Sequence, residues 1–384
     1  AVIFFGWNKV SRGFHLASTW LTGLGATISA WWILVANAWM QHPVGMTFNP
    51  DTVRNEMTDF TAVAFSPTAI VKFFHTISSG WMTGAVFVLG VSCWFLLKKR
   101  NTDLSLRSIK VASIAGIIAT LVVMGTGDQS GVTMAREQPM KLAAAEGLQQ
   151  GGTGAPFSIV PGIEVPKVLS ILATHDPEGY VPGIQDLLNG YTLPDGTQSP
   201  SAEEKINRGK KAIQAFGQYR QLRKTNPQAA QAALDTLNHH QAYMGYGYLQ
   251  NKEQLVPPIE LVYWSFRLMV GFGSFLFALL IVLGWMAYKQ KLHNQRWLLA
   301  LGVAAIPMVY VAGQAGWIVA EVGRQPWAIQ DLLPVGVAVS QLSATNVMVT
   351  FFLFLVLFTL LLIAEVRIMC KAISSYKQNE ISKP

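Results

Sequence analysis

Six long apolar segments constrain this chain more than any other feature of its sequence. They run approximately over residues 15–40, 67–97, 107–127, 259–287, 297–320 and 338–370. A helix of about 20 apolar residues crosses the ~30 Å hydrocarbon core of a bilayer, and each segment reaches that length. The sequence therefore predicts an all-α fold, a polytopic transmembrane helical bundle with six complete spans.

The overall composition supports a membrane protein and argues against other classes. Of the residues, 51% are hydrophobic and 13% are charged, about half the charged fraction of a typical soluble domain. The net charge of +8 is better explained by orientation in the bilayer than by nucleic-acid binding. Cys93 and Cys370 lie in or beside apolar segments, so we expect neither a disulfide framework nor a thiolate metal site.

The charges of the short loops predict how the chain is oriented. Acidic residues outnumber basic ones in segments 41–66 and 321–337, whereas the other short connections are basic. The basic residues are Lys9, Arg12, Lys98, Lys99, Arg100, Arg107, Lys289, Lys291, Arg296, Arg367, Lys371 and Lys377. Basic loops stay on the cytoplasmic side. We therefore expect both ends of the chain to be cytoplasmic.

Three regions follow from this topology. Residues 1–127 hold three complete spans, and their first residues, "AVIFFGW", are typical of the tail of an upstream helix, so we expect the natural protein to extend further. Residues 128–258 form a long polar loop on the outer side, with a helical segment near 201–224. Residues 259–384 hold three spans and a cytoplasmic tail. A loop as long as 128–258 is usually functional or disordered.

Two residues within predicted spans point to an iron cofactor. His75 lies about 8 residues into the second span and Met269 about 10 into the fourth, so both lie roughly 12–15 Å below the outer boundary. An imidazole and a thioether are the axial ligands of one class of six-coordinate haem. Ser79 and Gly273, one turn further on, leave room for a flat macrocycle. Arg267 is offset from Met269 and suits a haem propionate.

Other interpretations of these residues stay open. A lone histidine in a span is often a hydrogen-bonded packing residue, and methionine often fills gaps in a core. Glycine in a span often marks a contact between helices. Alternatively, the chain is a transporter or channel in which His75, Arg267 and Glu321 line a polar path.

The stretch "GWIVAEVGRQPW", residues 316–327, ends the fifth span with three residues on one helical face. These are Trp317, Glu321 and Arg324, and Pro326 is expected to end the helix. An interfacial tryptophan with an exposed ion pair is one interpretation. However, a carboxylate at the end of an outgoing helix opposes the helix dipole. A partner that binds an anionic oxygen, such as ferric iron, would offset that cost.

Four motifs together resemble subunit I of the cytochrome bd quinol oxidases. They are "SAWWILVANAWMQHP", "VKFFHTISSGWMTG", "YWSFRLM" and "GWIVAEVGRQPW", and the resemblance extends from residue 1 to about 375. It implies a haem-binding, multi-pass subunit of a respiratory electron-transport complex in the bacterial inner membrane. The implied cofactors are a low-spin haem b, a high-spin haem b and haem d. The implied partners are quinol, O2 and a second polytopic subunit, and the resemblance allows a small accessory subunit.

The resemblance also implies roles for individual residues. His75 and Met269 match the axial ligands of the low-spin haem b, and Arg267 matches an arginine that interacts with this haem. Glu321 matches the ligand of the high-spin haem b. Trp317 is similar to an aromatic residue between redox centres, and Arg324 suits a propionate.

Further residues match the family's quinol-oxidising loop and its proton path. In "MKLAAAEGL", Lys141 and Glu146 match two residues implicated in quinol binding; an ordinary solvated helix is the alternative. Ser29 and Asn37 resemble polar positions of a proton path, although small polar residues in helices are also packing contacts.

The function that the resemblance implies is quinol oxidation at the outer face. Electrons then pass through the b haems to a high-spin site that reduces O2 to water, so that a proton motive force arises without pumping. Family members carry the haem d ligand upstream of residue 1, and neither His15 nor His42 matches it. We therefore do not expect oxygen reduction by this chain unaided, and an inactive fragment of the oxidase remains an alternative.

Overall fold

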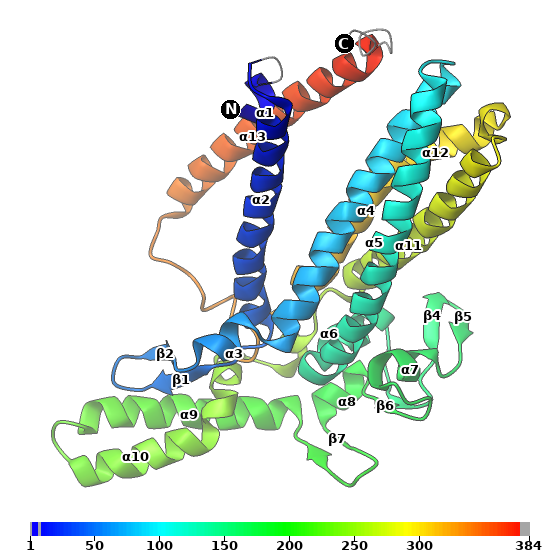
Figure 1. Cartoon of the computed structure of the whole chain (residues 1–384). Helices are drawn as coiled ribbons and strands as arrows, with labels where there is room; N and C mark the ends of the chain where they lie inside the picture. Colours follow the sequence, from blue (N-terminus) through cyan, green and yellow to red (C-terminus); the bar gives the residue numbers. More distant parts are fainter. Residues whose placement is uncertain (1, 7–8, 377–384) are drawn as a thin grey trace. The chain divides into compact units, whose positions relative to one another are not determined.

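The computed structural model describes residues 2–6 and 9–376 (Figure 1). Ala1 and Trp7 of the predicted upstream tail, and Lys377 of the predicted cytoplasmic flank, lie outside these residues. The described part of the tail contains one short helix, α1 (Val2–Phe5).

Six helices are long and apolar enough to cross a membrane, and the predicted all-α fold with six spans is confirmed. They are α2 (Arg12–Gln41), α4 (Pro67–Leu97), α5 (Thr102–Glu137), α11 (Ile259–Tyr288), α12 (Arg296–Val322) and α13 (Ala344–Ser375). Helix α12 ends at Val322, three residues earlier than the end at Gln325 that Pro326 predicted.

Two helix ends differ most from the predicted spans. Helix α5 continues ten residues beyond the predicted end at 127, because its polar last turns contain no proline before Pro139. Gln138, which precedes this proline, leaves the helical conformation with φ −138°. Helix α13 begins six residues later than predicted, where the Ser343 hydroxyl accepts a hydrogen bond from the Asn346 amide at 3.3 Å.

The long loop is folded rather than irregular. Its helices are α6 (Pro139–Glu146), α7 (Val168–Thr174), α8 (Ile184–Asn189), α9 (Ala202–Leu222), α10 (Pro227–His240), η1 (Gln241–Tyr248) and η2 (Lys252–Leu255). Its short strands are β3 (Gly152–Thr153), β4 (Phe157–Val160), β5 (Ile163–Val165), β6 (Tyr180–Val181), β7 (Tyr191–Thr192) and β8 (Gln198–Ser199). The helix predicted near 201–224 is confirmed as α9, which pairs with α10 in a helical hairpin (Figure 1).

Small elements complete the other connections. They are β1 (Met46–Asn49), β2 (Arg54–Met57), α3 (Phe60–Ala64), η3 (Leu292–Asn294), β9 (Trp327–Ile329) and β10 (Leu333–Pro334). The described strands pair only in antiparallel twos, β1 with β2, β3 with β6, β4 with β5, β7 with β8 and β9 with β10.

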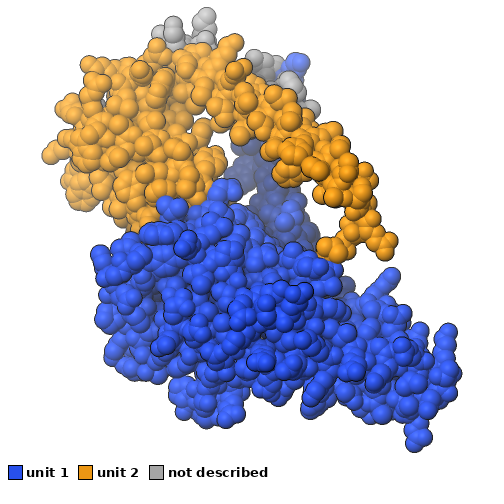
Figure 2. All heavy atoms as spheres, turned by 180° about the vertical axis from the view of Figure 1, so that it is seen from behind, with its two compact units in different colours: residues 1–80, 120–270, 313–337 blue, residues 81–119, 271–312, 338–384 orange. Residues whose placement is uncertain are grey.

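The chain divides into two compact units, coloured separately in Figure 2. Unit 1 comprises residues 1–80, 120–270 and 313–337, and unit 2 comprises 81–119, 271–312 and 338–384. Every residue predicted to ligate iron or to bind a propionate or quinol belongs to unit 1, whereas Gly273 belongs to unit 2. The candidate site can therefore be described within that unit.

The core of unit 2 shows why its helices carry glycine. Leu89, Ile109, Leu283 and Leu299, from α4, α5, α11 and α12, are at most 1% exposed. A Cβ added at Gly90 would lie only 2.9 Å from the Gly302 carbonyl oxygen and would overlap a neighbouring isoleucine. The two helices pack closely because neither has a side chain there.

We expect Gly90→Val to lower the thermal unfolding temperature of the protein in detergent. Overpacking of a close helix contact costs about 1–3 kcal/mol. Gly23→Ala is the matched control, because a Cβ at Gly23 of α2 meets no atom within 4 Å. Equal unfolding temperatures for the two variants would contradict the close packing of α4 on α12.

Candidate functional site

Helix α6 carries Lys141 and Glu146 into the interior of unit 1. It begins with Pro139 in its first turn and ends at Gly147, whose φ of +66° suits the left-handed turn after a helix. Its three alanines, 143–145, have no exposed surface, and two of them pack with Val262 of α11 and Val319 of α12. Methyl side chains allow this close approach.

Lys141 and Glu146 are therefore not residues of a solvated helix. Their exposed fractions are 4% and 6%. This excludes the solvated-helix alternative that the sequence left open, and burying two ionisable groups requires partners for both.

The Lys141 ammonium group is held by amides rather than by a carboxylate. Its Nζ donates to Gln41 Oε1 at 3.0 Å and to Gln138 Oε1 at 2.7 Å, and no ion pair to it is found among the residues that the structure describes. Burial lowers the pKa of Lys141 well below its usual value, and the nearby cations Lys72 and Arg324 lower it further.

Glu321 accepts hydrogen bonds on both carboxylate oxygens. Oε1 accepts from Asn37 Nδ2 at 2.9 Å and from Gln41 Nε2 at 3.4 Å, and Oε2 accepts from Arg324 Nη2 at 2.6 Å. Lys72 Nζ donates to Asn37 Oδ1 at 3.3 Å. These donors offset the unfavourable helix dipole at the end of α12. Since Arg324 is only 7% exposed, the pair differs from an exposed surface ion pair.

Arg267 is bound to the end of α6. Its Nη1 donates to the Ala145 carbonyl at 2.5 Å, and its Nη2 donates to Glu146 Oε2 at 2.8 Å and to the Ser158 carbonyl at 2.5 Å. The guanidinium lies 4.0 Å from the ring centroid of Tyr263. Burial raises the pKa of Glu146, and the Arg267 charge opposes that rise. The structure thus brings a predicted haem residue and a predicted quinol residue into one buried ion pair.

His75 and Met269 each lie beside a glycine of a neighbouring helix. His75 Nδ1 is 3.1 Å from Thr126 Oγ1 of α5, which leaves Nε2 for another partner. A Cβ added at Gly127 would lie 3.6 Å from His75 Cε1, and one at Gly316 of α12 would lie 3.0 Å from Met269 Sδ. The two predicted ligands are therefore positioned by different helices, α5 and α12.

The residues fit a flat iron cofactor with acidic substituents. Arg267 Nε, Arg324 Nε and Arg324 Nη1 are buried and find no partner among the described residues. A Cβ added at Gly80, Gly125 or Gly313 would meet no atom within 4 Å. Imidazole, thioether and carboxylate ligands suit haem iron, and unpaired guanidinium N–H groups suit carboxylates.

The other residues considered from sequence lie in varied surroundings. Trp317 is 41% exposed, and Ser29 is exposed on α2, whereas Asn37 belongs to the Glu321 network. His15 Nε2 is 3.1 Å from the Ile3 carbonyl. His42 Nδ1 is 2.7 Å from Glu137 Oε2.

Sequence reasoning missed the residues that connect the site. Lys72 is also an ionisable residue within a predicted span. The criterion that identifies His75 as a candidate functional residue therefore applies equally to Lys72. Gln41 and Gln138 carry no such signal, because an amide at the end of a helix is commonly solvated. Gln41 joins Lys141 to Glu321, whereas Gln138 joins Lys141 to Gln330. Both connections depend on tertiary packing.

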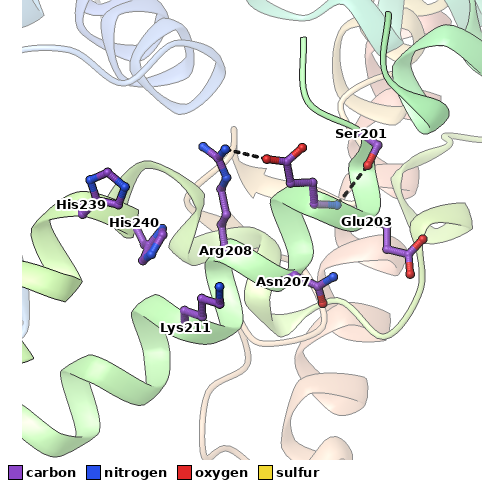
Figure 3. A pocket seen from close by; sticks show the side chains of 8 residues that line it. Ser201, Glu203, Asn207, Arg208, Lys211, His239 and His240 are labelled. Carbon is purple, nitrogen blue, oxygen red and sulfur yellow. Dashed lines mark hydrogen bonds and ion pairs between the residues drawn. The ribbon is translucent and has the colours of Figure 1, made fainter. Parts of the chain in front are cut away.

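Unit 1 contains two hollows. One, of about 290 Å³, is lined by Lys141, Arg324 and residues of the loop. The other, of about 530 Å³, is an open groove on the α9–α10 hairpin that none of the predicted site residues lines (Figure 3). Its lining residues are Ser201, Glu203, Glu204, Asn207, Arg208, Lys211, His239 and His240.

Comparison with known proteins identifies a single family over nearly the whole chain. The model of the family described as cytochrome bd terminal oxidase subunit I matches residues 1–377. Cytochrome bd-II ubiquinol oxidase subunit 1 of Escherichia coli is 36% identical, over 96% of this chain and 74% of that protein. Cytochrome bd ubiquinol oxidase subunit 1 of Bacillus subtilis is 33% identical, over 88% of this chain and 62% of that protein.

A solved structure shares the fold. The bd oxidase from Geobacillus thermodenitrificans superposes with a TM-score of 0.68 and 23% identity, over 96% of this chain and 72% of that chain.

We expect Arg267→Met to destabilise the protein by about 3–5 kcal/mol, because it leaves the Glu146 carboxylate buried without its partner. Replacing both residues, as Arg267→Met with Glu146→Leu, should cost less than the single change. Chemical unfolding in mixed micelles measures both values.

Arg208→Met is the matched control for this experiment. Arg208 forms an exposed ion pair with Glu204 at 2.5 Å, and loss of such a pair changes stability by about 1 kcal/mol or less. A similar effect for Arg267→Met would show that the buried pair does not hold α6 in place.

Proposed function

Because the chain belongs to the cytochrome bd terminal oxidase subunit I family, we propose that it oxidises quinol and delivers the electrons to the site that reduces O2. The resemblance predicted from its motifs is confirmed. Membership makes the chain a subunit of an oxidoreductase complex, with haem as the family's cofactor. Its six apolar helices make it a multi-pass membrane protein.

The observation that best supports the proposal is the position of α6. This short helix buries both predicted quinol residues, Lys141 and Glu146. Lys141 is joined to Glu321 through Gln41, and Glu146 is joined to Arg267, two residues from Met269. A quinol bound at α6 would therefore lie next to the residues proposed to hold haem.

Lys141 and Glu146 would bind and deprotonate the quinol. Oxidation of one quinol releases two electrons and two protons, so its hydroxyl groups need acceptors. Burial moves the pKa of both residues toward the neutral range, downward for Lys141 and upward for Glu146. A side chain within hydrogen-bonding reach of a quinol hydroxyl group could accept its proton.

The remaining residues would hold two haems b. We propose His75 and Met269 as the axial ligands of a low-spin haem b and Glu321 as the ligand of a high-spin haem b. Haem iron, when bound, supplies one-electron transfer, and a single protein ligand leaves a coordination position open. Arg267 and Arg324 would bind propionates through their unpartnered nitrogens. Trp317 would lie between the two groups.

The proposed topology follows the charges of the connections. Residues 1–127 and 259–384 form the two membrane regions, and residues 128–258 form the quinol-binding loop on the outer side of the bacterial inner membrane. The third haem of the proposed oxidase would be of d type. Helix α13 has no buried residue, so its apolar surface is available to lipid or to the second polytopic subunit.

We expect Met269→Leu to abolish the low-spin b-type α band in the reduced-minus-oxidised spectrum of the purified complex. Leucine keeps the volume but removes the thioether, so the haem loses a ligand. Met244→Leu is the control, since this methionine lies in the α9–α10 region of the loop. An unchanged α band in Met269→Leu would rule out Met269 as an axial ligand.

We expect Lys141→Met to lower kcat/KM for quinol by about tenfold or more, because the variant loses a proton acceptor. The haem spectrum should be unchanged. Steady-state oxygen consumption with varied quinol measures the effect. Lys167→Met serves for comparison, since Lys167 is exposed and pairs only with Glu178 at the surface. Equal kinetics in both variants would exclude Lys141 from quinol oxidation.

A further inference from the structure

Asp331 is a half-buried carboxylate to which neither the sequence analysis nor the proposed function assigns a role. It lies between β9 and β10, with φ +60°. Its Oδ1 accepts from the Tyr246 hydroxyl at 2.6 Å and from Gln330 Nε2 at 3.0 Å. A Cβ added at Gly245 would overlap the Asp331 carbonyl oxygen, so glycine there lets η1 pack directly against this turn.

The charged and titratable groups around Asp331 come from two elements and from the residue that follows α2. Tyr246 belongs to η1, and Lys205 belongs to α9. His42, which follows α2, also acts on the carboxylate and is itself paired with Glu137. Burial raises the pKa of Asp331, and the hydrogen bond from Tyr246 is the strongest opposing influence, followed by Lys205.

Asp331 and Lys141 line the same hollow of about 290 Å³. A cavity of this size has room for several water molecules, each of which occupies about 30 Å³ in the liquid. Its walls offer hydrogen-bonding groups from Gln138, Gln330 and Tyr246. Polar walls of this kind hold ordered water.

The hollow leads from the interior to solvent. Lys141, Arg324 and Trp327, which line it, are at most 7% exposed. Arg136, which also lines it, is exposed. A proton that leaves Lys141 therefore has a polar route outward.

A direct hydrogen-bonded chain runs beside the hollow. Lys141 Nζ donates to Gln138 Oε1 at 2.7 Å, Gln138 Nε2 donates to Gln330 Oε1 at 3.0 Å, and Gln330 Nε2 donates to Asp331. Amides do not exchange protons readily. This chain therefore orients Lys141 and Asp331, and water in the hollow must carry the proton.

We propose that Asp331 is the proton acceptor of this hollow, which takes up protons released by quinol oxidation near Lys141 and passes them to solvent. The inference rests on the proposed function. In each transfer, a hydronium ion in the hollow gives its proton to the Asp331 carboxylate and becomes water. The resulting carboxylic acid then gives the proton to a solvent water and is ready for the second proton of the same quinol.

The test uses the intact purified oxidase complex and two electron donors. Asp331→Asn should slow quinol-driven oxygen consumption by about tenfold or more. Consumption driven by reduced hexaammineruthenium, an outer-sphere donor that releases no protons, should be unchanged, as should the haem spectrum. Asp331→Glu should restore the quinol-driven rate. Asp235→Asn is the matched control, because Asp235 is exposed on α10 and accepts only from Gln231.

Tyr246→Phe provides a second test, because a purely structural role of Asp331 would leave the pH profile of quinol oxidation unchanged in this variant. Its hydroxyl lowers the pKa of Asp331, so its removal should raise that pKa. The acidic limb of the pH profile of quinol oxidation should then move to higher pH, because Asp331 must be deprotonated to accept a proton.

The outcomes separate this inference from the proposed function. A wild-type complex that consumes no oxygen with quinol would refute the proposed function and, with it, the inference. An active wild type with an unchanged rate in Asp331→Asn would refute the inference alone, as would an equal loss with both donors. If Asp331→Asn loses haem, the test rests on the pH profile of quinol oxidation by Tyr246→Phe. An acidic limb at the same pH as in the wild type would then overturn the inference.

Discussion

The Arg267 guanidinium holds together three parts of the chain that are distant in sequence. It extends from α11 to the end of α6 through Ala145 and Glu146, and to the loop strand β4 through Ser158. The Glu146 carboxylate balances the buried charge of this guanidinium, and removing either partner would leave the other charge buried and unpaired, which is strongly unfavourable. The position of α6, and hence of the rest of the candidate site, depends on this contact.

Helix α6 also explains why the candidate site is buried although it contains charged residues. Alanines bring α6 close to α11 and α12, and only 4% of Lys141 and 6% of Glu146 remain exposed. Their charges are then balanced in two different ways. Glu146 has an arginine partner, whereas Lys141 has only amide oxygens. A group without a counter-ion changes protonation more easily, and this supports a proton-transferring role for Lys141 in the proposed function.

The spans and the ionisable residues within them could be predicted from local sequence. Lipid requires about 20 apolar residues per helix, and an ionisable residue within such a stretch is conspicuous. The local sequence therefore identifies His75, Arg267 and Glu321 as candidate functional residues without information on their surroundings. The helix boundaries were less predictable, because the polar end of α5 continues the helix beyond the apolar segment.

The sequence by itself determined the membrane class, the six spans and the motifs that identify the family, because hydropathy and short motifs are local properties. Only the tertiary structure decided which polar groups meet. It placed Gln41 between Lys141 and Glu321, and it brought Asp331 to the hollow that Lys141 lines. These contacts join residues between 100 and 280 positions apart. No local pattern encodes them, since they depend on how α2, α6 and α12 pack.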